Sequence, residues 1–273
     1  MDGIWLLLVR MSDAIFGALN SLTGRSWLFD TIVAMPIDNN LVKAGPIGAC
    51  FVYAWWSGRD AEQTRKRRAS LLVTIGSLLF VMGATKTLSH EFFLPRPFVQ
   101  SQATWHLDET RLVEGKKLHY RAPVSGTTHA RYEAMKRGDI EQNDLVSFPS
   151  DHAGFFVALS LGIFFASRRA GAVALAWTFV AILLSRIATG MHSPLDIAAG
   201  ATIGAAIMTV IQLAARRGGR WALEPIAAWT TRHEALAAAL LFFVAVEWTS
   251  VLTNVRELAS TASEILSALS GRM

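Results

Sequence analysis

Long apolar segments alternate with short polar segments along most of this chain. The apolar segments lie at about 41–57, 70–92, 150–167, 172–187, 195–215 and 234–253. Most are close to the length of roughly 20 residues that a helix needs to cross the hydrocarbon core of a bilayer. The pattern predicts an all-α fold, an integral-membrane helical bundle with about six transmembrane helices.

The first segment of the chain has a different pattern. Within residues 4–22, the apolar side chains of Trp5, Leu8 and Phe16 are interrupted by Arg10 and Asp13. A helix of this amphipathic kind lies in the membrane interface instead of crossing the bilayer. We therefore predict a single membrane-embedded domain, 1–273, with an interfacial N-terminal segment at 1–40 and an amphipathic tail at 254–273.

Composition and charge support a membrane protein. The chain has 273 residues, of which 52% are hydrophobic, and this is too apolar for a soluble domain of the same length. Its formal net charge of +5 does not indicate a nucleic-acid partner, because the arginines cluster in short loops between apolar segments. Loops at 59–68, 168–169 and 216–220 have the excess of basic residues that marks the cytoplasmic face. We predict a multi-pass protein of the inner (plasma) membrane.

A long polar connection at 98–146 is predicted to be an extracytoplasmic loop. An unstructured loop of this length is uncommon and is usually functional or an embedded subdomain. Its histidines, His106, His119 and His129, are widely spaced and lack nearby carboxylates at ligand spacing. We predict no metal site and no cofactor, with a zinc site in this loop as the less favoured alternative.

Three polar blocks stand at the ends of successive apolar segments. They are Leu94–Pro97, Ser147–His152 and Ser185–Asp196. In the predicted topology all three lie on the face opposite the basic loops, so they would meet in one extracytoplasmic site. Ionisable residues at membrane depth are costly and indicate function.

The third block contains residue types at a spacing that suits phosphoryl-transfer chemistry. Ser193 and Asp196 have the spacing of a capping box, which places His192 just outside the positive end of a helix. Asp196 could contact one ring nitrogen of His192 and leave the other free as a nucleophile, while Arg186 offers a planar fork for phosphate oxygens. The alternative is that Asp196 only caps the helix and that Arg186 and His192 are interfacial anchors.

The sequence resembles the type-2 phosphatidic acid phosphatase superfamily over roughly residues 70–212, in particular its bacterial undecaprenyl-diphosphate phosphatase-like branch. The family pattern is K-x6-RP, then PSGH, then SR-x5-H-x3-D. The third part matches in full from Ser185 to Asp196, and the second matches at 149–152 with Asp151 in place of Gly. Arg96 matches the first part, but Lys86 lies ten residues before it, where the pattern requires seven.

The resemblance implies roles for the three catalytic candidates. His192 attacks phosphorus and forms a phosphohistidine, and Asp196 orients His192. His152 protonates the leaving oxygen and later activates water.

Four more residues are predicted to bind the substrate phosphate: Arg96, Arg186, Ser150 and Lys86. Arginine side chains suit phosphate oxygens. The alternative for Lys86 is a lysine that snorkels from the end of a span, and a helix break before Pro95 could bring it into register. We expect Asp151 to face the loop, away from the substrate.

The predicted function is hydrolysis of a membrane lipid phosphate within the bilayer, most specifically undecaprenyl diphosphate to its monophosphate. Alternatives within the family are phosphatidate, phosphatidylglycerol-phosphate and lipid A phosphatases. A lipid phosphotransferase and a non-catalytic lipid-binding or transport protein are further alternatives.

Overall fold

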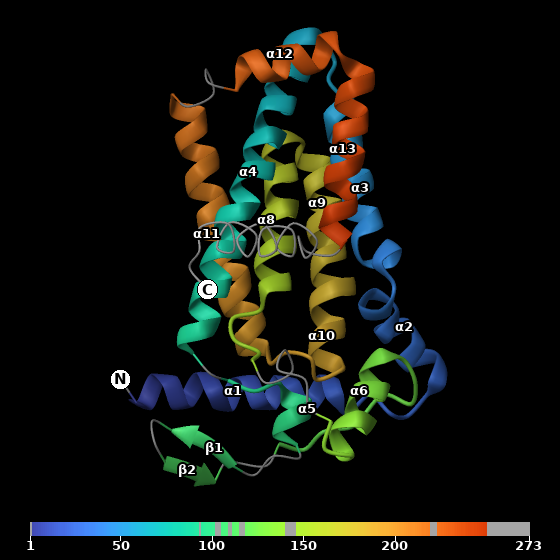
Figure 1. Cartoon of the computed structure of the whole chain (residues 1–273), viewed down its shortest axis with the longest axis vertical. Helices are drawn as coiled ribbons and strands as arrows, with labels where there is room; N and C mark the ends of the chain where they lie inside the picture. The colour runs from blue at the N-terminus through green and yellow to red at the C-terminus, as the bar shows by residue number, and fades with distance from the viewer. Residues whose placement is uncertain are drawn as a thin grey trace, which may run out of the picture.

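The computed structural model describes residues 2–92, 94–101, 105–108, 111–114, 118–139, 146–218 and 223–249. Its main body is a bundle of roughly aligned helices (Figure 1). The bundle contains α3 (Asn40–Trp56), α4 (Ala61–Glu91), α8 (Asp151–Ala166), α9 (Arg168–Trp177), α11 (Pro194–Arg217) and α13 (Glu234–Thr249). Helix α9 continues through a π-helical segment, η1 (Thr178–Leu183), into α10 (Leu184–Ala188). The predicted helical membrane bundle is confirmed.

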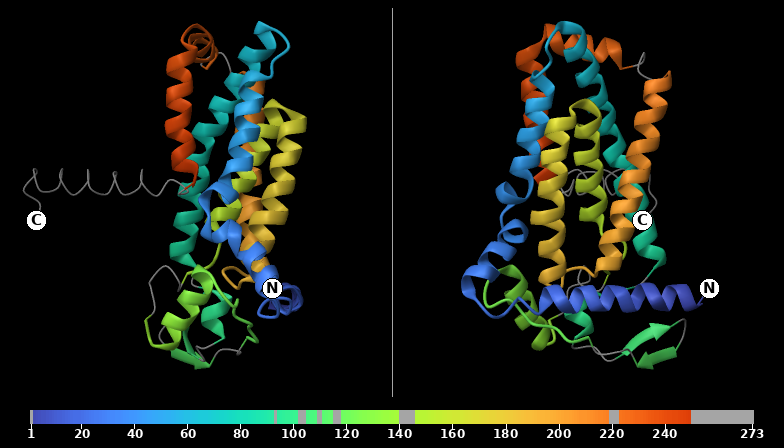
Figure 2. Two further views of the ribbon diagram at one scale, coloured as in Figure 1. Left: turned by 90° about the vertical axis from the view of Figure 1, so that its right-hand side faces the viewer. Right: turned by 180° about the vertical axis from the view of Figure 1, so that it is seen from behind.

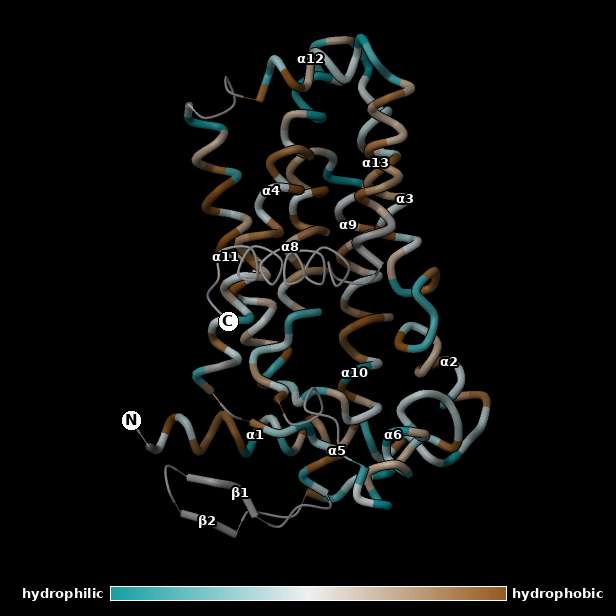
Figure 3. The backbone as a smooth tube through the Cα atoms, in the orientation of Figure 1, coloured by the Kyte–Doolittle hydropathy of each residue, from teal (hydrophilic) through white to brown (hydrophobic). Residues whose placement is uncertain are grey.

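Three of these helices are long and apolar enough to cross a bilayer: α4, the continuous α9–α10 helix, and α11. Helices α8 and α13 are apolar but shorter. Figure 3 shows hydrophobic residues along the middle of the bundle and hydrophilic ones concentrated toward its ends. The predicted tail at 254–273 lies outside the described residues.

Helix α1 (Asp2–Asn20) lies across one end of the bundle (Figures 1 and 2). By length and composition it could also cross a membrane, but its direction in the structure agrees with the predicted interfacial helix. The Asn20 side chain at its end donates to the carbonyls of Ala188 and Arg121, at 2.8 and 2.9 Å. The end of α1, and then α2 (Trp27–Asp38), are thereby fixed beside α10.

The predicted basic loops were too long: α9 already begins at Arg168 and α11 continues to Arg217, and the largest difference is in the first loop. Residues 59–68 were expected to form a loop, but α4 begins at Ala61, so Arg65 to Arg68 lie on its first turns. The physical reason is an N-cap: the Asp60 carboxylate accepts a hydrogen bond from the Gln63 backbone N–H at 2.7 Å. Arginine and lysine are good helix formers, so the basic run continues the helix.

Helix α8 lies at the centre of the bundle and is buried along most of its length. Glycines bring α11 very close to it. A Cβ at Gly200 would lie 2.1 Å from the Ser150 carbonyl oxygen, and one at Gly204 would lie 2.2 Å from that of Gly154. Small residues allow helix backbones to approach in this way. The close packing places the N-terminal ends of α8 and α11 side by side.

The 98–146 connection carries structure of its own. It contains α5 (Pro97–Gln100), a hairpin of β1 (Trp105–Asp108) and β2 (Arg111–Glu114), and α6 (Thr127–Lys136). The strands are antiparallel, with Trp105 opposite Glu114. A small buried cluster of Phe98, Val99, Met135 and Met191 attaches this region to the bundle. At the opposite end, α12 (Glu224–Arg232) connects to α13 (Figure 1).

Candidate active site

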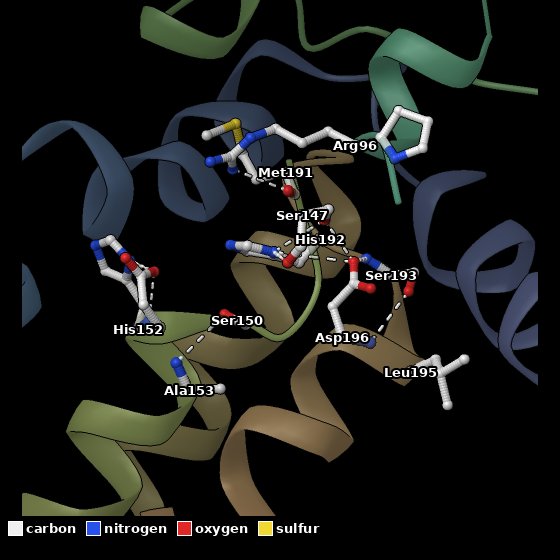
Figure 4. Close-up of polar contacts among 12 residues, drawn as sticks. Arg96, Ser147, Ser150, His152, Ala153, Met191, His192, Ser193, Leu195 and Asp196 are labelled. Carbon is white, nitrogen blue, oxygen red and sulfur yellow. Dashed lines mark hydrogen bonds and ion pairs between the residues drawn. The ribbon is translucent and has the colours of Figure 1, made fainter. Parts of the chain in front are cut away.

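The three polar blocks meet at the end of the bundle nearest α1, as predicted (Figure 4). Backbone hydrogen bonds connect them. The Ser150 N–H donates to the Asp196 carbonyl at 3.0 Å, and the Ser147 N–H donates to the Leu94 carbonyl at 2.7 Å. Arg96 Nη1 donates to the Met191 carbonyl at 3.0 Å. Each block therefore supports the position of another.

His192 has a defined tautomer. Its Nδ1 lies 3.1 Å from the Ser147 carbonyl oxygen, which can only accept a hydrogen bond. Nδ1 therefore carries the proton, and Nε2 carries a lone pair. Nε2 is buried and has no hydrogen-bond partner within the described part of the chain. A buried polar atom of this kind needs an explanation, and a reactive lone pair supplies one.

Burial, together with the nearby cations of Arg96 and Arg186, lowers the pKa of His192 well below its usual value. Only 2% of this residue is exposed. Desolvation and positive neighbours both disfavour an imidazolium. At neutral pH the ring is therefore uncharged, which is the state that a nucleophilic histidine requires.

Asp196 forms the predicted capping box with Ser193, with hydrogen bonds of 2.7 and 3.2 Å. Its Oδ2 lies 3.9 Å from His192 Nδ1, which is too long for the direct hydrogen bond that we expected. Ser147 Oγ lies between them, donating to Asp196 Oδ2 at 2.5 Å and lying 3.1 Å from Nδ1. Asp196 therefore reaches His192 through Ser147, a residue that the sequence analysis did not single out.

Arg186 is almost fully buried on α10, beside the nucleophile. Its backbone carbonyl accepts hydrogen bonds from the N–H groups of Met191 and His192, at 2.9 and 3.1 Å. Gly190 makes the turn between them possible, with a φ of 74°. Arg186 Nε is buried and unpartnered among the described residues. This donor, like His192 Nε2, is available to a ligand.

His152, on the first turn of α8, lies on another side of the site (Figure 4). Asp151 Oδ1 lies 2.8 Å from His152 Nδ1, and Asp151 Oδ2 lies 3.1 Å from Lys86 Nζ. The expectation that Asp151 faces the loop was therefore wrong: its carboxylate joins Lys86 to His152. The side chain can do so because it stands on the first helical turn, beside the histidine.

The predicted helix break before Pro95 is present, and Lys86 reaches the edge of the site. Helix α4 ends at Glu91, and Arg96 lies in the non-helical stretch before α5. The long lysine side chain, 43% exposed, spans the remaining distance to Asp151. Its observed contact is thus with a carboxylate at the edge of the site.

Ser150 is the N-cap of α8 and is fully buried. Its Oγ accepts a hydrogen bond from the Ala153 N–H at 3.3 Å. Because a hydroxyl can accept and donate at once, its proton can still be donated to a ligand oxygen.

Two further cations interact with this site. Lys43, on α3, is only 6% exposed and interacts electrostatically with Arg186, Asp151 and His152. Arg131, on α6, interacts with Arg186. The sequence analysis did not single out Lys43, because nothing in the local pattern shows which residues α3 faces.

The loop histidines do not form a metal site in the described residues, where no group of three or more His, Cys, Asp or Glu side chains could hold an ion. His129 Nδ1 lies 2.7 Å from the Pro123 carbonyl oxygen. The side chain of His106 lies outside the described residues.

Comparison with known proteins agrees with these observations. The chain matches the PAP2 superfamily over residues 67–219, more than half of its length. It is 36% identical over 86 residues to the bacitracin transport permease protein BcrC of Bacillus licheniformis. The aligned region covers 30% of this chain and 42% of that protein. No solved structure matches the chain significantly. The site residues of all three polar blocks fall within the matched range, and the chain belongs to the PAP2 superfamily.

Proposed function

We propose that this protein is a membrane lipid phosphatase that hydrolyses an isoprenyl diphosphate, undecaprenyl diphosphate, to the monophosphate. The observation that carries the proposal is the buried, unprotonated Nε2 of His192 beside the unpartnered Nε of Arg186. The site thus contains a nucleophile and a cation that can bind phosphate, and phosphoryl transfer needs both.

In the first step, the Nε2 lone pair of His192 forms a bond to the terminal phosphorus. The bond from that phosphorus to the bridging oxygen breaks, and its electron pair leaves with the lipid monophosphate. His152 donates a proton to the leaving oxygen, and the negative charge of the bound diphosphate, together with the Asp151 carboxylate 2.8 Å from Nδ1, favours the protonated ring. Arg96 and Arg186 bind the phosphoryl oxygens as charge develops.

In the second step, water attacks the phosphohistidine. His152 takes the proton from this water, the P–N bond breaks, and its electron pair returns to Nε2. Inorganic phosphate leaves, and the original protonation states are restored. The arginines supply the positive charge that a metal supplies in many other phosphatases, so no metal takes part in this scheme.

The number of cations favours a diphosphate over a phosphate monoester. Lys43 and Arg131 interact with the same site as the two motif arginines. A buried lysine is costly unless an anion compensates it. Because Lys43 interacts with His152, the proposed leaving-group acid, it is suited to bind the phosphate that stays on the lipid.

We place the site on the extracytoplasmic face of the inner membrane. The basic residues of the early α4 turns, Arg168, Arg169 and Arg216 lie at the opposite end of the bundle from the site (Figure 1). Basic residues concentrate on the cytoplasmic side of membrane proteins.

The name of the Bacillus relative, a bacitracin transport permease, favours a second candidate, transport. A transporter needs a binding site but not a poised nucleophile. The two candidates therefore differ in whether phosphate is released.

A phosphate-release panel on the purified protein tests the proposal. The substrates are an isoprenyl diphosphate, the isoprenyl monophosphate, phosphatidate, phosphatidylglycerol-phosphate and lipid A, each with and without EDTA. We expect the diphosphate to have the highest kcat/KM, one phosphate released per lipid, and no effect of EDTA. A preference for another lipid would reject the substrate, loss restored by a divalent ion would reject the metal-free scheme, and binding without release would favour transport or lipid binding.

A variant of Lys43 tests whether this residue recognises the second phosphate. Lys43→Met should reduce kcat/KM for the diphosphate about 10-fold more than for the monophosphate, as expected for the loss of one charged contact, and Lys43→Arg should restore part of it. Equal losses on both substrates would remove Lys43 from recognition of the second phosphate.

A further inference from the structure

A cavity of about 550 Å³ opens at the end of the bundle opposite the active site. Five arginines line it: Arg59, Arg67, Arg168, Arg169 and Arg216. They come from four parts of the chain, namely the segment after α3, the first turns of α4, the start of α9 and the end of α11. No carboxylate belongs to the cavity lining in the described residues.

The arginines are not neutralised by the protein. None of the five forms an ion pair with a carboxylate within the described ranges, in contrast to the nearby Arg68, which pairs with Glu234 at 3.0 Å. Arg67 instead donates to the Ser57 carbonyl at 2.8 Å and to the Ser57 hydroxyl. Arg216 donates to the Phe165 carbonyl at 2.9 Å. These contacts orient two guanidinium groups but leave their charge uncompensated.

The residues that line the cavity include the start of a helix. Helix α9 begins at Arg168, and its N-cap residue, Ser167, makes no side-chain capping bond. The first N–H groups of a helix lack partners within the helix and carry a partial positive charge, so they bind anions. Ser167 also lines the cavity.

The surroundings select the type of anion. The cavity lies where the bundle would meet the membrane interface, between α3 and α9, which pack against each other. The same two helices expose apolar side chains beside it, including Val52, Tyr53 and Val173 at 48%, 59% and 59%. An anion with attached acyl chains would satisfy both the arginines and these surfaces. Basic pockets between membrane helices bind acidic lipid headgroups in this way.

The usual excess of basic residues on the cytoplasmic side explains the positive charge at this end of the bundle but not the arrangement of the arginines. Arg65 and Arg217 lie at the same end of the bundle, are exposed, and do not line the cavity. The five lining arginines, by contrast, converge from separate segments on one concave space. We propose that this cavity binds the phosphate of an anionic phospholipid headgroup, at a site separate from the catalytic one.

The test compares ligands and matched variants in zwitterionic detergent. Thermal unfolding of the full chain is followed with phosphatidylglycerol, phosphatidylcholine or inorganic phosphate. For the wild type we expect phosphatidylglycerol to raise Tm by about 5 °C or more at a hundredfold excess over Kd. Arg168→Gln/Arg169→Gln should lose most of this shift, whereas Arg65→Gln/Arg217→Gln, with the same charge change on the same face, should keep it.

Two controls separate this site from its alternatives. The Tm shift should persist in Arg96→Gln, because lipid bound only at the catalytic site would lose affinity there. Inorganic phosphate should give a much smaller shift than phosphatidylglycerol at equal phosphate concentration. The proposal is overturned by equal shifts with inorganic phosphate, by equal losses in both arginine pairs, or by a shift that disappears in Arg96→Gln. None of these results depends on which lipid the enzyme hydrolyses.

Discussion

Two histidine–carboxylate pairs lie in the same site, and they are built differently. His192 and Asp196 are each 2% exposed, and Ser147 connects them. His152 and Asp151 are in direct contact at 2.8 Å, and their side chains are 22% exposed. The first pair is fixed from several directions, whereas the second lies where water and a leaving group can reach it.

The difference agrees with two chemical tasks. A nucleophile must stay uncharged and hold one orientation, and burial beside arginines gives His192 both properties. A group that donates and later accepts a proton must exchange protons with its surroundings. Asp151 supports that role in His152, and Lys86 holds Asp151 from the other side at 3.1 Å.

The largest expected effect comes from removing the nucleophile. His192→Ala should lower kcat by about 10³-fold or more, because no other side chain can form the covalent intermediate. The steady-state rate of phosphate release measures this effect, and an unchanged Tm shows that the fold is intact. Retention of more than a few per cent of the wild-type rate, which would be far above this expectation, would place the nucleophile elsewhere.

The second-largest expected effect comes from removing the Ser147 hydroxyl, which connects His192 to Asp196. Ser147→Ala removes the hydroxyl that donates to Asp196, and hydrogen bonds to charged groups contribute roughly 1.5–3 kcal/mol, so kcat should fall about 10- to 150-fold. Ser160→Ala is the matched control: it removes another buried hydroxyl, 2.9 Å from Thr178 Oγ1, and should lower stability without changing kcat. Equal kinetic effects of the two variants would show that Ser147 has only a structural role.

Variants of Asp151 and Lys86, beside His152, should have a smaller effect on kcat, and this effect should depend on the leaving group of the substrate. Asp151→Asn and Lys86→Met should each lower kcat about 10-fold on alkyl phosphates, and their effects should not add because they act through one contact. On p-nitrophenyl phosphate, whose leaving group needs little protonation, both losses should shrink. Arg96→Ala should cost more than either.

A lysine elsewhere provides the control for that experiment. Lys136→Met breaks an exposed pair with Glu133 on α6 and should leave kcat unchanged. Additive losses, or losses that are the same for alkyl and aryl phosphates, would separate Lys86 and Asp151 from the function of His152.

The smallest effect is a shift of the pH profile. Because the pKa of His192 is lowered, its neutral form persists to acidic pH, and activity is lost only as the pH falls through that lowered value. The acid limb of kcat/KM should therefore lie below about 6.5, the ordinary histidine pKa. Arg96→Gln removes one cause of the lowering and should move the acid limb to higher pH. The ionisation of the substrate affects the wild-type and Arg96→Gln profiles equally. If the acid limb does not move in the variant, this limb reports the titration of another group.

The motifs predicted which residues meet, because short patterns determine local structure. The capping box at Ser193 fixed the start of α11 and hence the place of His192. Gly200 and Gly204, four residues apart in the sequence, have the spacing of small residues at a helix contact, and they pack against α8. Both features depend on residues that are close together in the chain, so they can be recognised in the sequence.

The contacts that were missed join distant parts of the chain. Ser147 lies 45 residues from His192 and 49 from Asp196, and Lys86 reaches Asp151 from another helix. Lys43 comes from α3, outside the range that matches the PAP2 superfamily. A helical pattern shows that a lysine is near the end of a span but not which neighbour it faces, since that depends on helix packing.

The central claim is that His192 Nε2 carries the phosphoryl group, and trapping the intermediate tests it most directly. In His152→Ala, which lacks the group that activates water, p-nitrophenyl phosphate labelled with ³²P, whose leaving group needs little protonation, should leave acid-labile, alkali-stable label on the protein. Proteolysis and mass spectrometry should place the label on Nε2 of His192, and Ser147→Ala should accumulate it more slowly. Label on any other residue, or continued turnover without a labelled protein, would contradict the mechanism.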